Sequence, residues 1–166
     1  MSILNNEDQM DRLRIQLILN EGLSLTMYKC TAGKNTIGVG RNVDDNPLTD
    51  EEKKHLGNKN IFKTGITKEE AMYLLDNEIN EVIGKLTRQI SIFIKLDPIR
   101  QRVLIDLGFN MGVPGLLKFK NTLAALNRLD YEATAKGLEN SLWFTQIKTR
   151  GPRVVKMMRT GEDFIE

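Results

Sequence analysis

Glu21 occupies a position in the sequence that suits acid catalysis. Apolar residues recur at helical spacing from Met10 to Asn20, and Gly22 is placed to end that helix, so Glu21 falls at its C-terminal end. The partial negative charge of the unpaired carbonyls there favours a protonated carboxyl group. Such a carboxyl can protonate the leaving oxygen of a glycosidic bond. A glutamate at a helix end is more often an ordinary surface residue, so position alone leaves both interpretations open.

Two short strand-like stretches follow Glu21 and predict a β-hairpin. The stretches are Leu25–Lys29 and Thr36–Val39, and a glycine-containing turn separates them. Cys30 and Thr36 flank that turn. Glycines at positions 38 and 40 indicate a bulge or a close approach by another chain segment or a ligand, because glycine otherwise weakens a strand.

The sequence lacks the side chains that a metal site needs. The single cysteine, Cys30, can form neither an intramolecular disulfide nor a thiolate cluster within the chain. The single histidine, His55, stands among charged residues with no partner at ligand spacing, and we interpret it as a surface residue. We therefore expect no metal ion and no cofactor.

The composition is that of a soluble globular domain. Of the 166 residues, 40% are hydrophobic and 28% are charged, which argues against disorder. The formal net charge is only +2, so the overall charge does not indicate a dedicated nucleic-acid or membrane-surface protein.

One stretch near the end of the chain is locally basic. Residues 141–159 contain Lys148, Arg150, Arg153, Lys156 and Arg159 and no acidic residue. This pattern fits an anionic partner such as nucleic acid, but a solvated helix face is the more ordinary explanation.

The first residues do not resemble an export signal. Residues 1–11 include three acidic side chains and lack a basic start followed by an apolar stretch. The apolar patch Ile90–Ile94 is far shorter than the roughly 18 residues that indicate a membrane span. We expect a monomer that is made in the cytoplasm and inserts in no membrane.

Helix signals dominate the rest of the chain. Two capping boxes, Thr49 to Glu52 and Thr67 to Glu70, each predict a helix start, and the second precedes about five turns of apolar periodicity. Asp97-Pro98 predicts another start. Further helices are predicted, and these are Leu123–Arg128, Tyr131–Glu139 and Arg153–Arg159, with Gly161 closing the last.

These elements predict an α+β fold in a single domain of residues 1–166. A small mixed lobe with the hairpin sheet spans residues 12–66, and a long helix at 67–90 joins it to a larger helical lobe at 91–166. The N-terminal helix is expected to pack with the helical lobe.

Glu21, Cys30 and Thr36 are separated by eight and five residues, and the last opens the run Thr36-Ile37-Gly38-Val39-Gly40. This segment resembles the active-site segment of the T-even phage lysozymes, which are glycoside hydrolases. Further motifs resemble that family in the same order, and these are Gly65-Ile66-Thr67-Lys68-Glu69-Glu70-Ala71, Phe109-Asn110-Met111-Gly112, Phe119-Lys120-Asn121-Thr122-Leu123, Ser141-Leu142-Trp143-Phe144 and Arg159-Thr160-Gly161.

The resemblance implies an inverting muramidase that cleaves the bond between N-acetylmuramic acid and N-acetylglucosamine in peptidoglycan. Glu21 would be the general acid, while Cys30 and Thr36 would handle the water. Phe109, Thr122 and Arg150 fall at substrate-binding positions. Arg150 matches an arginine close to the acid, whose charge would oppose the effect of the helix end. The resemblance also implies release to the cell wall at host lysis with the help of a holin.

The sequence departs from the family pattern at several positions. Cys30 stands where Asp is usual. A thiol with a pKa of about 8.5 is mostly neutral at pH 7 unless its neighbours lower that pKa, so Cys30 is expected to serve as a base less well than a carboxylate. Arg41 replaces a histidine and removes its expected ion pair, and Gly137 replaces a substrate-contacting asparagine. Trp143 is assigned to packing.

Two alternatives to an active muramidase follow from these departures and from the basic stretch. Because free cysteines are usually inert core residues, Cys30 could instead mark a peptidoglycan-binding protein that has a lysozyme fold without turnover. A basic helical domain that binds nucleic acid rests only on the stretch from Lys148 to Arg159 and lacks interleaved aromatic residues.

Overall fold

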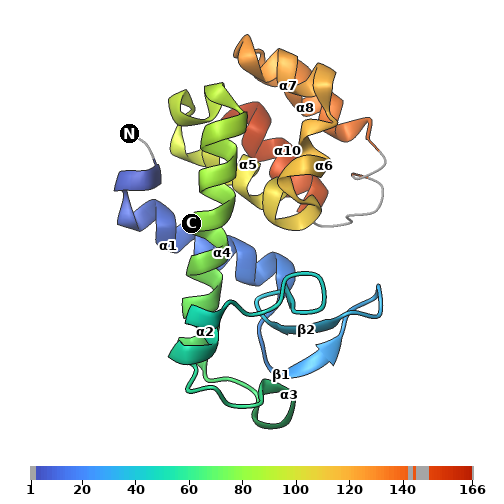
Figure 1. The fold of residues 1–166 in the computed structure, drawn as a ribbon. Helices are drawn as coiled ribbons and strands as arrows, with labels where there is room; N and C mark the ends of the chain where they lie inside the picture. The colour runs from blue at the N-terminus through green and yellow to red at the C-terminus, as the bar shows by residue number, and fades with distance from the viewer. Residues whose placement is uncertain (1–2, 142–143, 145–149, 166) are drawn as a thin grey trace. The chain divides into compact units, whose positions relative to one another are not determined.

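The computed structural model describes residues 3–141, 144 and 150–165, and it forms two compact units (Figure 1). The small unit comprises Arg14–Asn80, and the helical unit comprises Met1–Leu13 with Glu81–Glu166. Helices α1 and α4 each contribute residues to both units. A three-stranded antiparallel sheet accompanies the helices in the described part of the chain, which confirms the predicted α+β class.

Helix α1 spans Glu7–Glu21 and ends where the sequence predicts. Gly22 has a φ of +78°, a left-handed conformation that glycine adopts without a Cβ penalty. Its N–H donates to the carbonyl oxygen of Ile18 at 2.8 Å, which closes the last turn. Glu21 is therefore the last residue of the helix, as predicted.

The sheet contains β1 (Ser24–Lys29), β2 (Asn35–Gly38) and β3 (Arg41–Asn42) in that order. Strands β1 and β2 form the predicted hairpin. Strand β3 was not predicted, because two residues are too few to show an alternating pattern. It pairs with β2 through Thr36 opposite Asn42 and Ile37 opposite Arg41.

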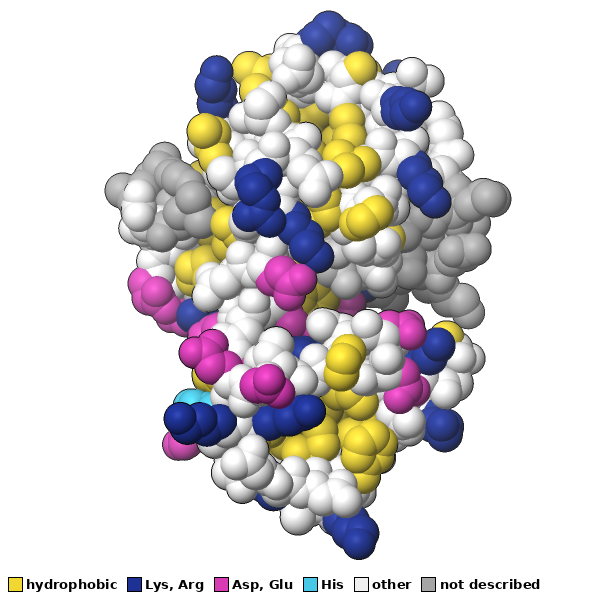
Figure 2. All heavy atoms as spheres, in the orientation of Figure 1, with side chains coloured by type: hydrophobic (Ala, Val, Ile, Leu, Met, Phe, Trp, Pro, Cys, Tyr) yellow, Lys and Arg dark blue, Asp and Glu magenta, His cyan; other side chains and the backbone are white. Residues whose placement is uncertain are grey.

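Two short helices complete the small unit, α2 (Asp50–His55) and α3 (Ile61–Thr64). The predicted capping box begins α2, with hydrogen bonds between Thr49 and Glu52 in both directions. The core of the unit packs side chains from the sheet, α3, α4 and the segments that join these elements, and its buried members are Ile37, Val43, Leu56, Ile61, Ile66, Ala71 and Leu74. His55 is exposed (Figure 2) and stacks on Tyr73 with ring centroids 3.7 Å apart.

Helix α4 spans Lys68–Gln89, and its predicted capping box also forms. The N–H of Thr67 donates to Glu70 Oε1 at 2.8 Å, and the N–H of Glu70 donates to Thr67 Oγ1 at 3.1 Å. Among the described residues, none of the helices combines the length and the apolar character that a membrane crossing needs.

The helical unit is built from short helices around a core of branched and sulfur-containing side chains. The predicted starts at Asp97 and Tyr131 are confirmed. The five-residue α6 was not predicted, because the pair Pro114-Gly115 is typical of a break between helices. The helix forms because Pro114 lies in its first turn, where proline is tolerated. The elements are η1 (Ile3–Asn5), η2 (Ser91–Lys95), α5 (Pro98–Met111), α6 (Val113–Leu117), α7 (Lys120–Asn127), α8 (Tyr131–Glu139) and α10 (Arg150–Thr160).

Candidate functional site

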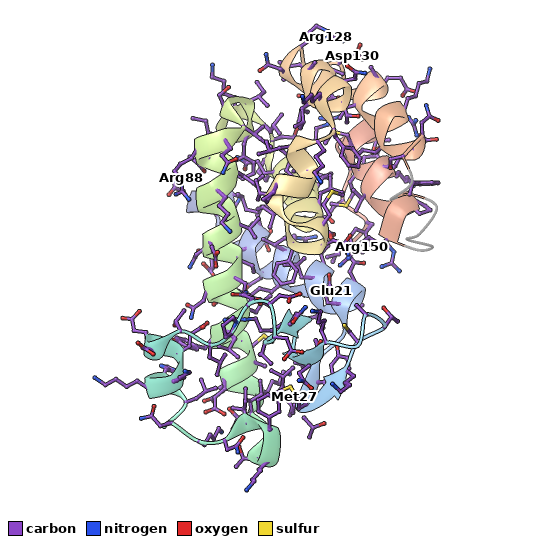
Figure 3. The ribbon with its side chains drawn as sticks, turned by 45° about the vertical axis from the view of Figure 1, so that its right-hand side comes forward. Glu21, Met27, Arg88, Arg128, Asp130 and Arg150 are labelled. Carbon is purple, nitrogen blue, oxygen red and sulfur yellow. The ribbon has the colours of Figure 1, made fainter. Side chains whose placement is uncertain are left out.

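The side chain of Glu21 lies at the end of α1 and rests against the turn between β2 and β3 (Figure 3). A Cβ atom built on Gly40 in that turn would lie 2.9 Å from Glu21 Oε2 and 3.1 Å from Glu21 Cβ. The close approach that the sequence predicts at Gly40 is therefore made by Glu21. Gly38, the other glycine of that prediction, has only ordinary van der Waals contacts at this position.

Cys30 and Thr36 lie together at the turn of the hairpin. The N–H of Cys30 donates to the carbonyl oxygen of Lys34 at 3.0 Å, and the N–H of Gly33 donates to that of Cys30 at 2.8 Å. Thr36 is buried, and its hydroxyl also donates to the Lys34 carbonyl oxygen, at 3.0 Å. The turn therefore holds the thiol and the hydroxyl on a fixed backbone.

The turn changes the acidity of the thiol. Hydrogen bonds from the backbone of Lys34, and next from that of Ala32, lower the pKa of Cys30. Burial opposes this effect, and the nearby Thr36 hydroxyl adds to the lowering. Cys30 therefore reaches the thiolate form more easily than a free cysteine does, so a larger fraction of it can accept a proton at neutral pH.

Tyr28 is a member of the site to which sequence reasoning gave no role. It pairs directly with Thr36 across the hairpin, so the two side chains lie on the same face of the sheet. Burial raises the pKa of the Tyr28 phenol, and the negative charges of Glu21 and Cys30 raise it further. Because both charges act on one phenol, Glu21 and Cys30 lie within electrostatic reach of the same point.

Arg41 forms a buried ion pair with Glu52, although the sequence predicted that Arg41 would remove an ion pair. Its guanidinium donates to Glu52 Oε1 at 2.8 Å and to Oε2 at 3.1 Å, and both side chains are 3% exposed. Arg41 Nε also lies 3.6 Å from Glu78 Oε1. The predicted loss of an ion pair at Arg41 is therefore wrong. The sequence did not reveal these partners, because Glu52 and Glu78 belong to helices whose places beside β3 are set only by the tertiary fold.

The predicted substrate-binding residues belong to the helical unit. Phe109 lies half-buried in α5, whereas Thr122 in α7 is buried. A Cβ atom on Gly137 would lie 2.2 Å from Thr122 Oγ1, so glycine at 137 makes room for that hydroxyl. Arg150 begins α10 and is buried in an ion pair with Asp106 at 3.2 Å.

Two cations of the basic stretch at residues 141–159, Arg150 and Arg159, form ion pairs with acidic neighbours. Besides the pair of Arg150, Arg159 forms ion pairs with Glu132 and Glu139, and the Arg153 guanidinium lies over the Phe164 ring. These pairs weaken the nucleic-acid hypothesis. Lys148 of this stretch, and Trp143 with its predicted packing role, lie outside the described residues.

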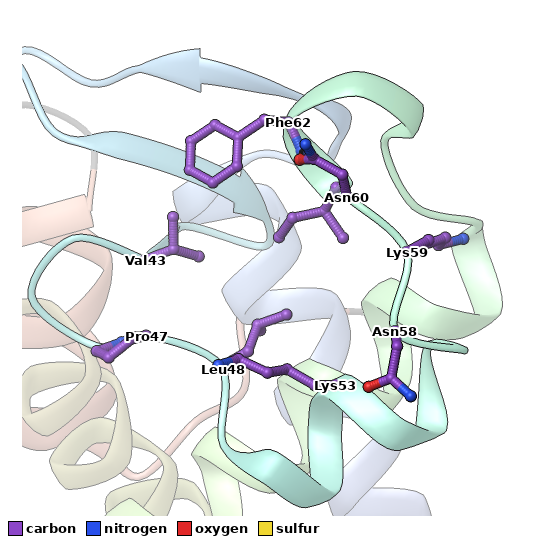
Figure 4. A pocket seen from close by; sticks show the side chains of 9 residues that line it. Val43, Pro47, Leu48, Lys53, Asn58, Lys59, Asn60 and Phe62 are labelled. Carbon is purple, nitrogen blue, oxygen red and sulfur yellow. Dashed lines mark hydrogen bonds between the residues drawn. The ribbon is translucent and has the colours of Figure 1, made fainter.

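The predicted catalytic residues lie neither in a group of metal-ligating side chains nor in the lining of the small unit's cavity, as far as the described residues show. Across residues 3–141, 144 and 150–165, no group of three His, Cys, Asp or Glu side chains could hold a metal ion. The cavity has a volume of about 280 Å³, and its lining includes none of Glu21, Cys30 and Thr36 (Figure 4). Its walls combine apolar side chains such as Leu48 and Phe62 with polar ones such as Lys53.

Comparison with known proteins gives a consistent result. A family model described as phage lysozyme matches residues 19–157. The Pre-baseplate central spike protein Gp5 of Enterobacteria phage T4 is 33% identical over 156 residues, which cover 86% of this chain but only 26% of the spike protein. The protein named Probable T4-type lysozyme 2 of Dictyostelium discoideum is 30% identical over 161 residues, which cover 90% of this chain and 94% of that protein. A second Dictyostelium relative, Probable T4-type lysozyme 1, is also 30% identical, with 90% and 94% covered.

The fold and the matched family define the class as glycoside hydrolases of the lysozyme type. The chain belongs to the phage lysozyme family, which confirms the resemblance seen in its motifs.

Proposed function

We propose that this chain hydrolyses the β-1,4 bond between N-acetylmuramic acid and N-acetylglucosamine in peptidoglycan, with inversion at the anomeric carbon. The observation that carries the proposal is the grouping in the small unit. Glu21 rests on Gly40, while the Cys30 thiol and the Thr36 hydroxyl lie on the hairpin, in which Thr36 pairs with Tyr28. The group contains one acid and one pair able to hold water, as an inverting hydrolase requires.

In the proposed mechanism, Glu21 donates its proton to the glycosidic oxygen as the bond to the anomeric carbon breaks. A water held by Cys30 and Thr36 attacks that carbon from the opposite face, and its proton passes to the Cys30 thiolate. Glu21 is then a carboxylate and Cys30 a neutral thiol. Solvent returns the proton from the thiol to the carboxylate, which restores the starting state.

The lowered pKa of Cys30 favours an active hydrolase over a protein that binds peptidoglycan without cleaving it. A thiol in an inert core has no donors around it, whereas Cys30 receives hydrogen bonds from the backbone of Lys34 and Ala32. Phe109, Thr122 and Arg150 are proposed to contact the glycan strand. We further propose that the enzyme acts as a monomer, reaches the cell wall at host lysis with a holin, and takes peptidoglycan as its partner.

The test is release of reducing ends from purified peptidoglycan and clearing of bacteria whose outer membrane has been permeabilised. The wild-type chain should do both, and Glu21→Gln should abolish both. Glu69→Gln is the matched control, because Glu69 is an exposed glutamate near the start of α4. Retained activity in Glu21→Gln would contradict the mechanism. An inactive wild type that gains activity on Cys30→Asp would instead support a binding protein without turnover.

A further inference from the structure

Arg41 is the residue that directly follows the turn on which Glu21 rests. It is 3% exposed, and it forms part of β3. Besides Glu52, its guanidinium donates to the carbonyl oxygens of Asn46 at 2.8 Å and Pro47 at 3.0 Å. A planar guanidinium with several donors in use has little freedom to move, and lysine cannot reproduce this pattern.

Glu52, the partner of Arg41, is itself held from two other directions. Its carboxylate accepts the N–H of Thr49 at 2.9 Å and the side-chain amide of Asn77 in α4 at 3.1 Å. Burial acts to raise the pKa of Glu52, but the hydrogen bonds from Arg41, Thr49 and Asn77 outweigh it and hold the pKa at about 2. The pair therefore stays charged at neutral pH and ties β3 to α2 and α4.

The same pair fixes both halves of the catalytic group through the backbone. Toward the N-terminus, Arg41 is joined to Gly40, which supports the carboxyl group of Glu21. Toward the C-terminus it is joined to Asn42, which pairs with Thr36. Movement of the guanidinium would therefore displace the support of the acid and the neighbour of the hydroxyl together.

We propose that Arg41 and Glu52 are positioning residues of the catalytic site, because their buried ion pair fixes Gly40 beneath Glu21 and Asn42 beside Thr36. The inference rests on the proposed function, which gives Glu21 and Thr36 their roles. Stability alone does not account for the pair, since a buried ion pair is often no more stabilising than apolar residues of similar volume. A bidentate pair does define a geometry, and misplacement by about 1 Å can cost about a hundredfold in rate.

The first test alters the contact between Gly40 and Glu21 without breaking the ion pair. Gly40→Ala places a methyl group against the Glu21 side chain. Gly57→Ala is the matched control, because Gly57 has a similar φ of +71° but open space around its Cβ position. Both variants bear the same backbone strain. Only Gly40→Ala should lower kcat, by about tenfold or more, on soluble glycan fragments.

The second test breaks the ion pair and compares it with a similar pair elsewhere. Arg102 in the helical unit is 0% exposed and donates to both carboxylate oxygens of Asp163, at 2.6 and 2.9 Å. Arg41→Lys and Arg102→Lys should both lower the unfolding midpoint. Arg41→Lys alone should lower kcat, about tenfold, with KM unchanged. Equal kcat values in the two variants, measured well below their unfolding temperatures, would overturn the inference.

A spectroscopic measurement separates this inference from the proposed function. The ¹³C signal of the Glu21 carboxyl, assigned by its loss in Glu21→Gln, should move in Gly40→Ala and Arg41→Lys and stay in place in Gly57→Ala and Arg102→Lys. This measurement needs no substrate. If the wild type releases no reducing ends, the proposed function fails while the signal still tests positioning. If the wild type is active and the signal stays in place in all four variants, positioning fails.

Discussion

The turn that carries Cys30 and the cluster around Glu52 both favour the charged form of an acidic group, but by different means. At Cys30 the largest cause is hydrogen bonding from the backbone of Lys34 in an exposed turn. At Glu52 a buried cation, Arg41, opposes the cost of burial. The comparison teaches that the charge on Cys30 is placed where the proposed chemistry could use it, whereas the charge on Glu52 holds the structure around the site. A half-buried thiol can exchange protons with water, whereas the buried carboxylate loses its partner only when the structure opens.

The largest effect on stability is expected from Glu52→Ala. It removes the bidentate partner of the buried Arg41 guanidinium and leaves only the Glu78 carboxylate, 3.6 Å away, which should lower the free energy of unfolding by about 3 kcal/mol. Chemical denaturation at pH 7 measures this change. Glu51→Ala on the same helix is the control, because Glu51 is exposed and its replacement should change stability by less than about 0.5 kcal/mol. Similar losses of unfolding free energy in the two variants would mean that the ion pair between Arg41 and Glu52 does not stabilise the fold.

Cys30→Ala should affect the reaction and not the fold. Removal of the proposed proton acceptor should lower kcat by about a hundredfold, equivalent to about 2.7 kcal/mol in the barrier. The unfolding midpoint should change little, because Cys30 is half-buried in a turn. Cys30→Asp, which restores a carboxylate, should recover activity. An unchanged kcat in Cys30→Ala would remove the thiol from the mechanism.

The charge of Glu52 should also appear in the pH dependence of stability. A carboxyl whose pKa falls from 4.5 to about 2 on folding adds about 3 kcal/mol at neutral pH as an upper limit. The sign follows from the depressed pKa. The contribution is present above about pH 4.5 and is lost as the pH falls toward about 2. The stability difference between the wild type and Glu52→Gln should therefore shrink between pH 5 and pH 2, and a constant difference would contradict this linkage.

The smallest effect is expected from Thr36→Val on the reactivity of Cys30. The Thr36 hydroxyl lowers the pKa of the thiol less than the backbone of Lys34 and Ala32 does, so its loss should raise that pKa only modestly. The rate of alkylation by iodoacetamide, measured against pH, reports the thiolate. Thr26→Val is the control on the exposed part of β1. If Thr36→Val shifts the pH profile of alkylation as far as unfolding the protein does, the Thr36 hydroxyl rather than the backbone is the main cause of the lowered pKa of Cys30.

Local signals made much of the fold predictable. Residues close together in the sequence predicted several elements, and each formed as expected. These are the helix end at Gly22, the two capping boxes and the hairpin with a glycine-containing turn. Strand β3 and helix α6 were not predicted, because a two-residue strand has no period and Pro114-Gly115 is typical of a break.

The sequence by itself determined the helix-end position of Glu21, its spacing to Cys30 and Thr36, and the family to which these motifs point. Helix ends and turns depend on residues a few positions apart, so the sequence alone is enough to predict them. Only the tertiary structure decided that Gly40 lies against Glu21, that Tyr28 lies within electrostatic reach of Glu21 and Cys30, and that Arg41 pairs with Glu52. These contacts join segments whose approach is set by packing of the whole small unit, and residue types alone do not specify it.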